Sequence, residues 1–308
     1  MNIKGKLGLA ALAVFVFSVS AFSQKVFTRA ATAGAQRAII ISTEPNATVW
    51  VDDVKRGVTD AAGKLAGVKL STTSKILRVR ATGFKQSVTN LTAATKGTVT
   101  VKLAVTGDKA ELLFQKAEAL RETPLNSEDR DKAVELYREA LKIRPNFAEA
   151  HLGLARVFFD LKDTDNAMIE VKQARKYRAA YPEASAVEGR IFHDDADDEN
   201  AVKSYQRAIK EGGGYQPEAH TGLGIIYREQ ENYEDAIKEF KIAIAQLFDT
   251  EPVIYQLLGD LLEKTRRFKE AIAIYEQFLK AAPEGPDAIA VRSMIVQLKI
   301  QVAEDQPE

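Results

Sequence analysis

The sequence of 308 residues contains no cysteine. This absence excludes disulfide bonds, thiolate metal sites and a cysteine nucleophile. It also excludes a bacterial lipoprotein anchor, which requires a cysteine directly after the signal segment. Histidine is scarce as well, and occurs only as His151, His193 and His220.

Catalytic motifs are absent too. The sequence has no Ser-His-Asp arrangement, no Gly-Lys-Ser/Thr phosphate loop and no His-Glu-x-x-His. Three glycines at 212–214 follow no strand and precede no lysine in register, so we interpret them as a helix end and connector. His193 precedes an acidic run at 194–199 that lacks the alternating aspartates and central glycine of a calcium loop, which favours a solvated turn over a metal site. We predict no enzyme activity, no cofactor and no metal.

Long apolar runs are missing except near the amino terminus. Lys4 and Lys6 precede an almost wholly apolar run at 7–19, which is too short to span a membrane as a mature helix. Small residues at 21 and 23 have the spacing of a signal peptidase site. The sequence therefore predicts an exported chain with a signal peptide at 1–23, either cleaved or retained as an anchor, and a linker at 24–37.

The net charge is zero, but the two signs are separated along the chain. Residues 24–107 contain 13 lysines and arginines against 4 acidic residues, whereas residues 108–308 contain 28 against 39. A basic first part and an acidic second part indicate two domains with different surroundings, unless both are simply well solvated. The acidic second part would repel phosphate, which argues against a nucleic-acid partner.

From residue 38, the basic part has the sequence pattern of β-strands. Residues 39–41 are a β-branched run, and the stretches 48–53, 75–80 and 98–103 alternate with period two between turn-forming residues. This pattern puts apolar side chains on one face of each strand and lysine, arginine and threonine on the other. It predicts a small all-β antiparallel sandwich at 38–103.

The opening of this segment resembles a PEGA domain. Residues 41–53 (ISTEPNATVWVDD) correspond to a strand, a Pro-x-Gly-Ala turn and a second strand with an aromatic residue and an acidic turn. Residues 57–60 (GVTD) stand at the family's Gly-Thr-Pro loop, and residues 80–84 (RATGF) resemble its strand that ends in Gly-Tyr. Asn46 replaces the family glycine and Asp60 the proline, but asparagine tolerates left-handed backbone. The resemblance implies a surface or accessory module of exported prokaryotic proteins.

From residue 108 the apolar residues follow a helical period, and the pattern repeats. Prolines at 145, 182, 217, 252 and 283 separate the units, where proline can begin a helix. Each unit has a small residue followed four positions later by an aromatic or branched one. The small residues lie 34 or 35 positions apart, at Ala133, Ala167, Ala201, Ala236 and Ala271.

This pattern resembles the tetratricopeptide repeat (TPR). The resemblance implies an all-α TPR superhelix of five repeats at 108–283, followed by a capping helix at 284–302 and a tail at 303–308. Small residues such as Gly224 and Gly259 let two helices approach closely, and aromatic residues such as Tyr275 fill the gaps between units. His151 and His220 fall at equivalent first-helix positions, which favours a packing role over a ligand role.

The family geometry also predicts which positions face the concave groove. Apolar residues interleaved with arginines there suit a peptide that carries carboxylates or a free C-terminus, although the positions can equally be ordinary solvated ones. The Lys/Asn clamp of chaperone-binding members is not reproduced. The predicted groove residues are Leu152, Arg156, Phe159, Arg190, His193, Ile225, Arg228, Gln256 and Asp260.

These observations predict an exported, non-enzymatic adaptor, which is periplasmic, envelope-associated or secreted and binds a protein or peptide partner in its TPR groove. One alternative is a structural envelope protein whose β domain binds cell-wall polymer or anionic lipid. Another is an accessory subunit of an envelope enzyme complex. The basic face of the β domain has a further possible target, which is the acidic array of the same chain.

Overall fold

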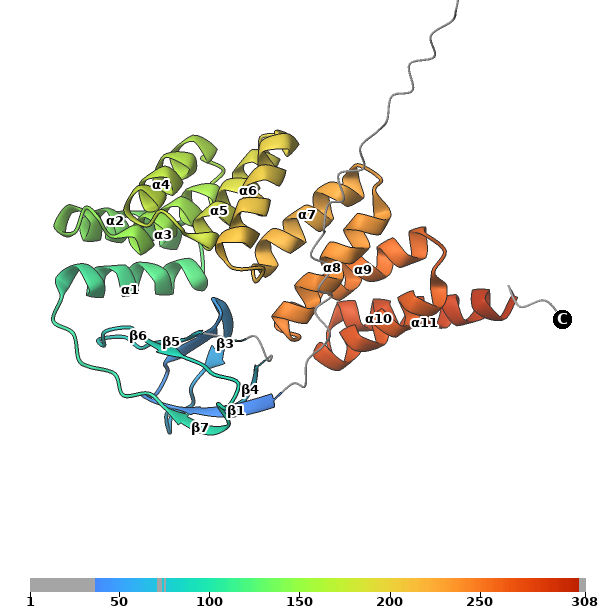
Figure 1. The fold of residues 1–308 in the computed structure, drawn as a ribbon, viewed down its shortest axis with the longest axis horizontal. Coiled ribbons are helices and arrows are strands. Elements are labelled where there is room, and N and C mark those ends of the chain that lie inside the picture. Colours follow the sequence, from blue (N-terminus) through green and yellow to red (C-terminus); the bar gives the residue numbers. More distant parts are fainter. Residues whose placement is uncertain (1–36, 71–73, 75, 305–308) are drawn as a thin grey trace, which may run out of the picture. The chain divides into compact units, whose positions relative to one another are not determined.

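The computed structural model describes residues 37–70, 74 and 76–304. The predicted signal peptide, the linker up to residue 36 and the last four residues of the tail lie outside the described residues. Ala33–Glu308 forms one compact unit, in which β-strands precede a series of α-helices (Figure 1). The β-strands are β1 (Arg37–Ser42), β2 (Thr48–Val51), β3 (Val54–Val58), β4 (Lys64–Leu70), β5 (Ile76–Arg80), β6 (Ser87–Asn90) and β7 (Gly97–Thr100).

The strands form two sheets that enclose one apolar core. One sheet has the order β4-β1-β7 and the other the order β3-β2-β5-β6. Because side chains alternate along a strand, Ile39 and Ile41 of β1 and Val49 and Val51 of β2 all point into this core. The predicted sandwich is present, with one difference in strand direction: β7 pairs in parallel with β1.

The turn between β2 and β3 lies where the sequence pattern still predicted strand. Asp52 and Asp53 both have left-handed backbone, with φ of 49° and 66°. Two such residues in succession are characteristic of the two-residue hairpin turn that matches the twist of its strands. The strand predicted at 48–53 therefore ends at Val51, and β3 contains Gly57, which had been assigned to a turn.

The second part of the unit is a series of paired helices. Helices α1 to α10 follow one another as antiparallel pairs, from α1 with α2 to α9 with α10 (Figure 1). The helices are α1 (Lys109–Glu122), α2 (Ser127–Ile143), α3 (Ala148–Asp160), α4 (Thr164–Tyr177), α5 (Pro182–Asp194), α6 (Asp198–Glu211), α7 (Pro217–Glu229), α8 (Tyr233–Leu247), α9 (Val253–Lys264), α10 (Phe268–Ala281) and α11 (Pro286–Glu304).

Small residues and aromatic rings hold the pairs together. The five alanines that define the repeat are all fully buried. A Cβ atom added to Gly259 of α9 would lie 2.2 Å from Cε1 of Tyr275 on α10, and one added to Gly224 of α7 would lie 2.7 Å from Cε1 of Phe240 on α8. Glycine at these positions therefore allows the ring of the second helix to contact the backbone of the first.

Helix α11 packs against the last repeat. Its residues Val291, Ile295 and Leu298 are buried in the core formed with α8, α9 and α10. None of the helices in the described part of the chain is long and apolar enough to cross a membrane.

Candidate partner-binding groove

A cavity of about 730 Å³ lies between the first helices of the second to fifth repeats. Helices α3, α5, α7 and α9 contribute to its wall, together with the turn between β2 and β3. We call this cavity the groove. Five of the nine residues predicted from the sequence line it, namely Arg156, Phe159, Arg190, His193 and Ile225.

Two arginines converge on one carboxylate in the groove. Nη2 of Arg156 on α3 lies 3.8 Å from Oε2 of Glu218, and Nη1 of Arg190 on α5 lies 3.3 Å from its Oε1. The Arg190 guanidinium also lies 4.5 Å from the centre of the Phe159 ring. Because equivalent positions of successive first helices are neighbours in the array, cations from two repeats reach one site. This site accommodates a carboxylate, which Glu218 provides within the chain.

The side chain of His193 is held by acidic residues rather than by a metal-binding set. Its Nδ1 lies 2.9 Å from Oδ1 of Asp198, and its Nε2 lies 3.6 Å from Oε2 of Glu229. The acidic run after it provides the N-cap of α6, because Asp197 accepts a hydrogen bond from the backbone of Asn200. Among the described residues, no group of three or more potential ligands is arranged to hold a metal ion.

Apolar side chains form the wall of the groove towards the last repeats. Ile225 of α7 lies there with Leu247 at the end of α8 and with Val253 and Leu257 of α9. Val253 is 53% exposed, which leaves apolar surface open on this side. An apolar wall beside a pair of arginines suits a peptide with both apolar and acidic side chains.

The other four predicted residues lie elsewhere. Leu152 is buried in the core of the first repeats and lines a second cavity of about 90 Å³, between α3 and the β-strands. Arg228, Gln256 and Asp260 do not line the large cavity. Oδ1 of Asp260 instead accepts a hydrogen bond of 2.7 Å from the Tyr275 hydroxyl.

Sequence reasoning missed the residues that the β domain contributes to the groove. Asp52, Asp53, Val54 and Lys55 all line it. It also missed Glu183 on α5, which is only 8% exposed and has no hydrogen-bond partner for Oε2 in the described structure. Burial, and then the nearby Asp53, raise the pKa of Glu183 to about 7. The acidic turn at 52–53 was the only sequence signal for this contact.

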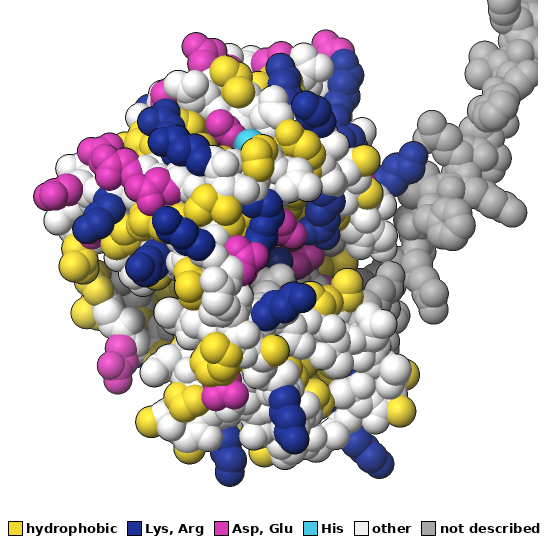
Figure 2. All heavy atoms as spheres, turned by 90° about the vertical axis from the view of Figure 1, so that its left-hand side faces the viewer, with side chains coloured by type: hydrophobic (Ala, Val, Ile, Leu, Met, Phe, Trp, Pro, Cys, Tyr) yellow, Lys and Arg dark blue, Asp and Glu magenta, His cyan; other side chains and the backbone are white. Residues whose placement is uncertain are grey.

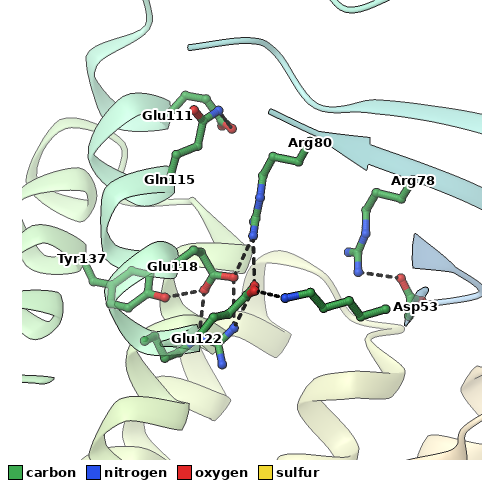
Figure 3. Close-up of polar contacts among 10 residues, drawn as sticks. Asp53, Arg78, Arg80, Glu111, Gln115, Glu118, Glu122 and Tyr137 are labelled. Carbon is green, nitrogen blue, oxygen red and sulfur yellow. Dashed lines mark hydrogen bonds and ion pairs between the residues drawn. The ribbon is translucent and has the colours of Figure 1, made fainter. Parts of the chain in front are cut away.

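A buried charge network joins the β domain to α1 (Figure 3). Nη2 of Arg80 on β5 lies 3.2 Å from Oε2 of Glu118, which also accepts hydrogen bonds from Arg121 and from the Tyr137 hydroxyl. Burial alone would raise the pKa of Glu118, but Arg121 and Arg80 outweigh burial and hold the pKa well below its usual range. The carboxylate is therefore ionised, and removal of either arginine would leave its buried charge with one cation in place of two.

The separation of charge along the chain now has a structural counterpart. Nζ of Lys55 lies 2.6 Å from Oε2 of Glu122, and Nζ of Lys69 lies 2.6 Å from Oδ2 of Asp249. On the face in Figure 2, acidic side chains gather mostly over the helices, at the upper level of the view. Part of the basic charge of the β domain is thus paired with the acidic array of the same chain.

The two equivalent histidines have a packing role. Nδ1 of His151 lies 2.6 Å from Oε2 of Glu170, and Nδ1 of His220 lies 2.6 Å from Oε2 of Glu239. Both rings are buried, and each joins the first helix of its repeat to the second. The repeated geometry places them in the framework of the array rather than in the groove.

Paired helices stacked through small residues, with a concave wall of first helices, define a helical-repeat scaffold. Family models described as tetratricopeptide repeat match residues 125–191, 188–252 and 252–284. The chain belongs to the tetratricopeptide repeat family. Solenoids of this kind present extended concave surfaces to other proteins, so the repeats support a role as a protein–protein interaction scaffold.

Solved structures share the array. A thermophilic TPR protein of Thermus thermophilus is 23% identical, with a TM-score of 0.51 over 61% of this chain and 99% of that one. The pilF protein of Pseudomonas aeruginosa is 18% identical (TM-score 0.51, 63% and 92%), and yeast Tom70 is 15% identical (TM-score 0.54, 64% and 41%). At these identities the likeness shows the fold alone. No curated protein sequence matches the chain.

Proposed function

We propose that this chain is an exported, non-enzymatic scaffold that binds a peptide segment of a partner protein in the groove. The observation that carries the proposal is the convergence of Arg156 and Arg190 on one carboxylate beside the exposed apolar wall. A partner carboxylate, from a side chain or a C-terminus, would take the place of Glu218. Apolar partner side chains would pack on Ile225 and Leu257.

The proposal extends to the location and the domains of the chain. The amino-terminal pattern at 1–23 supports export to the periplasm or cell envelope. The PEGA-like segment at 38–103 would space or tether the TPR repeats at 108–283, which the helix at 284–302 would cap. The pairing of Lys55, Lys69 and Arg80 with acidic residues of the helical array leaves less of the basic charge for lipid or cell-wall polymer.

The experiment is a capture assay with a matched control. The purified chain would be cross-linked in an envelope extract and compared with the double variant Arg156→Glu/Arg190→Glu. Lys172→Glu/Lys176→Glu is the control, because it makes the same change in net charge at two exposed positions of α4, which does not line the groove. We expect the original chain and the control to capture the same partner in similar amounts. The double variant should capture at least ten times less of it. Equal capture by all three proteins would contradict the groove assignment.

Export is tested separately. The amino-terminal residue of the protein isolated from an envelope or culture fraction would be determined by sequencing. We expect Gln24 at the new amino terminus if the segment is cleaved, or Met1 in a membrane fraction if it is retained. Recovery of the whole chain in the cytoplasmic fraction would contradict export without affecting the groove.

A further inference from the structure

The hairpin formed by β2 and β3 reaches from its own domain to the helices, and residues 52–55 form part of the wall of the groove. We call residues 51–56 the groove hairpin. Val54, directly after the turn, is 8% exposed and belongs to the apolar cluster of α8 to α11, not to the core between the two sheets. Val54 belongs to a strand of the β domain, but its side chain packs in the core of the helical array. An apolar side chain of a bound ligand would make the same kind of contact.

Arg56 makes the most specific contact of the hairpin. Its Nη1 donates a hydrogen bond of 2.7 Å to the carbonyl oxygen of Leu247, the last residue of α8. Its Nη2 donates to the carbonyl oxygen of Gln246 (3.1 Å) and to the Tyr215 hydroxyl (2.9 Å). The last carbonyls of a helix lack intrahelical donors and carry partial negative charge, so a guanidinium is well suited to cap them. The guanidinium also lies 4.8 Å from the centre of the Phe248 ring.

The hairpin conformation is itself costly. Asp52 and Asp53 both adopt left-handed backbone, which asparagine and glycine accept more readily. Oδ1 of Asp53 lies 3.1 Å from Nη2 of Arg78, and after burial the charge of Asp53 is the next cause that raises the pKa of Glu183. The turn at 52–53 is thus strained, acidic and close to a buried acid, which weakens its attachment to the helices. Val54 and Arg56 strengthen the attachment.

The β domain has a second attachment that does not depend on the groove. Arg80 pairs with Glu118 on α1, and the backbone N–H of Gly83 donates a hydrogen bond of 3.0 Å to the Gln115 side chain. Release of the hairpin from α8 would therefore leave the domain close to the array. A tethered group of this kind competes at a high effective concentration with any free ligand.

We propose that the groove hairpin is an internal ligand seated against the end of α8 at the edge of the groove, and that the partner displaces it there with a segment of the same chemistry, an apolar residue two positions before an arginine. This inference rests on the proposed function, because it assumes that the groove binds a partner. Only molecules in which the hairpin is released bind the partner, so the apparent affinity for the partner is the intrinsic affinity multiplied by the released fraction. A released fraction of about 10% therefore weakens binding about tenfold.

The test uses the hairpin itself as the probe. A fluorescent peptide with the sequence of residues 48–58, closed by a disulfide between added terminal cysteines, would be titrated into the full chain. The variant Arg56→Ala/Lys69→Ala weakens the internal contact with α8 and with Asp249 while leaving the groove wall unchanged. Lys102→Ala, an exposed residue of the same domain, is the control.

At an open fraction of about 10% in the original chain, we expect the double variant to bind the peptide up to about ten times more tightly than the original chain and the control. A peptide with the changes V54D and R56A should not bind to any of them. Equal binding to the original chain and the double variant, or no binding to either, would overturn the inference. If the double variant unfolds, which circular dichroism would reveal, Val54→Ser provides the same comparison.

The two proposals fail in different ways. If the peptide binds the double variant as expected but the Arg156→Glu/Arg190→Glu chain still captures the partner, the internal ligand stands and the proposed partner site does not. If that chain loses the partner while the peptide shows no competition, the partner site stands without the internal ligand.

Discussion

The contacts within the array and the contacts between the array and the β domain are of different kinds. Inside the array, the same pair of a small residue and an aromatic ring recurs in several units, as with Gly259 and Tyr275. Between array and β domain, each of the described contacts occurs once, and several of them depend on charge, as with Arg80 and Glu118. Repetition distributes the stability of the array over many equivalent contacts, whereas each contact with the β domain depends on one or two side chains.

The largest expected effect concerns the charge network at α1. Glu118→Ala removes the buried carboxylate that Arg80, Arg121 and the Tyr137 hydroxyl share, and leaves the two arginines only the more exposed Glu122. The free energy of unfolding should therefore fall by about 3–5 kcal/mol. Urea denaturation measures the change. Glu135→Ala, at an exposed position of α2, is the control and should change stability by less than about 0.5 kcal/mol.

The same network has a pH dependence of known sign. Because the pKa of Glu118 is lower in the folded chain than in the unfolded one, its contribution is present above about pH 4.3 and is lost as the pH falls further. The difference in stability between the original chain and Glu118→Ala should therefore shrink in acid. A difference that stays constant down to pH 2 would show that charge is not its cause.

A contact inside the array should have a somewhat smaller effect. Gly259→Ala places a methyl group 2.2 Å from the Tyr275 ring, which must move, so we expect a loss of about 1–3 kcal/mol in the free energy of unfolding. Gly107→Ala adds the same group where no atom lies within 4 Å, and is the control. Equal midpoints in urea for the two variants would contradict the close packing.

The buried acid in the groove should behave in the opposite way to Glu118. Burial and Asp53 raise the pKa of Glu183 to about 7, so ionisation is penalised in the folded chain as the pH rises from about 4 to 7. Glu183→Gln should therefore stabilise the chain by about 2 kcal/mol at pH 8 and have little effect below pH 4. Thermal denaturation at several pH values tests this, and a gain that does not depend on pH would refute it.

The smallest effect should be that of a helix cap. The Asn126 side chain accepts a hydrogen bond of 3.0 Å from the backbone N–H of Asp129 at the start of α2. Asn126→Ala should lower the free energy of unfolding by about 1 kcal/mol, and Asn126→Asp should restore it. If both variants are equally unstable, the cap is not the cause of the loss.

The comparison also explains what could be predicted from the sequence. The repeats were predictable because the alanines recur every 34 or 35 residues, so five weak local signals combine into one. Groove residues such as Arg156 and Arg190 followed from the same geometry. Leu152 lies about one turn before Arg156 and therefore on the same face of α3, but at that level the face is buried in the core of the first repeats and beside the smaller cavity, not in the groove.

The contacts of the β domain could not be predicted in the same way. Arg56 and Leu247 are 191 positions apart, and nothing in the local pattern relates them. Alternation predicted the sandwich but extended the second strand through Asp52 and Asp53, because an acidic turn does not interrupt a period of two. The separation of basic and acidic residues along the chain was the only broad indication that the two parts could attract each other.

The position of the β domain has a mechanical consequence. It is attached to α1 through Arg80 and to the end of α8 through Arg56, so it links the first helix of the first four repeats to the last one. A solenoid lengthens by small rotations between successive repeats, and a domain that is attached to two distant helices of the solenoid opposes that motion. Under a pulling force, the elastic extension of this array should come first from α9 to α11. Helices α1 to α8 should move apart only after one of the two attachments breaks.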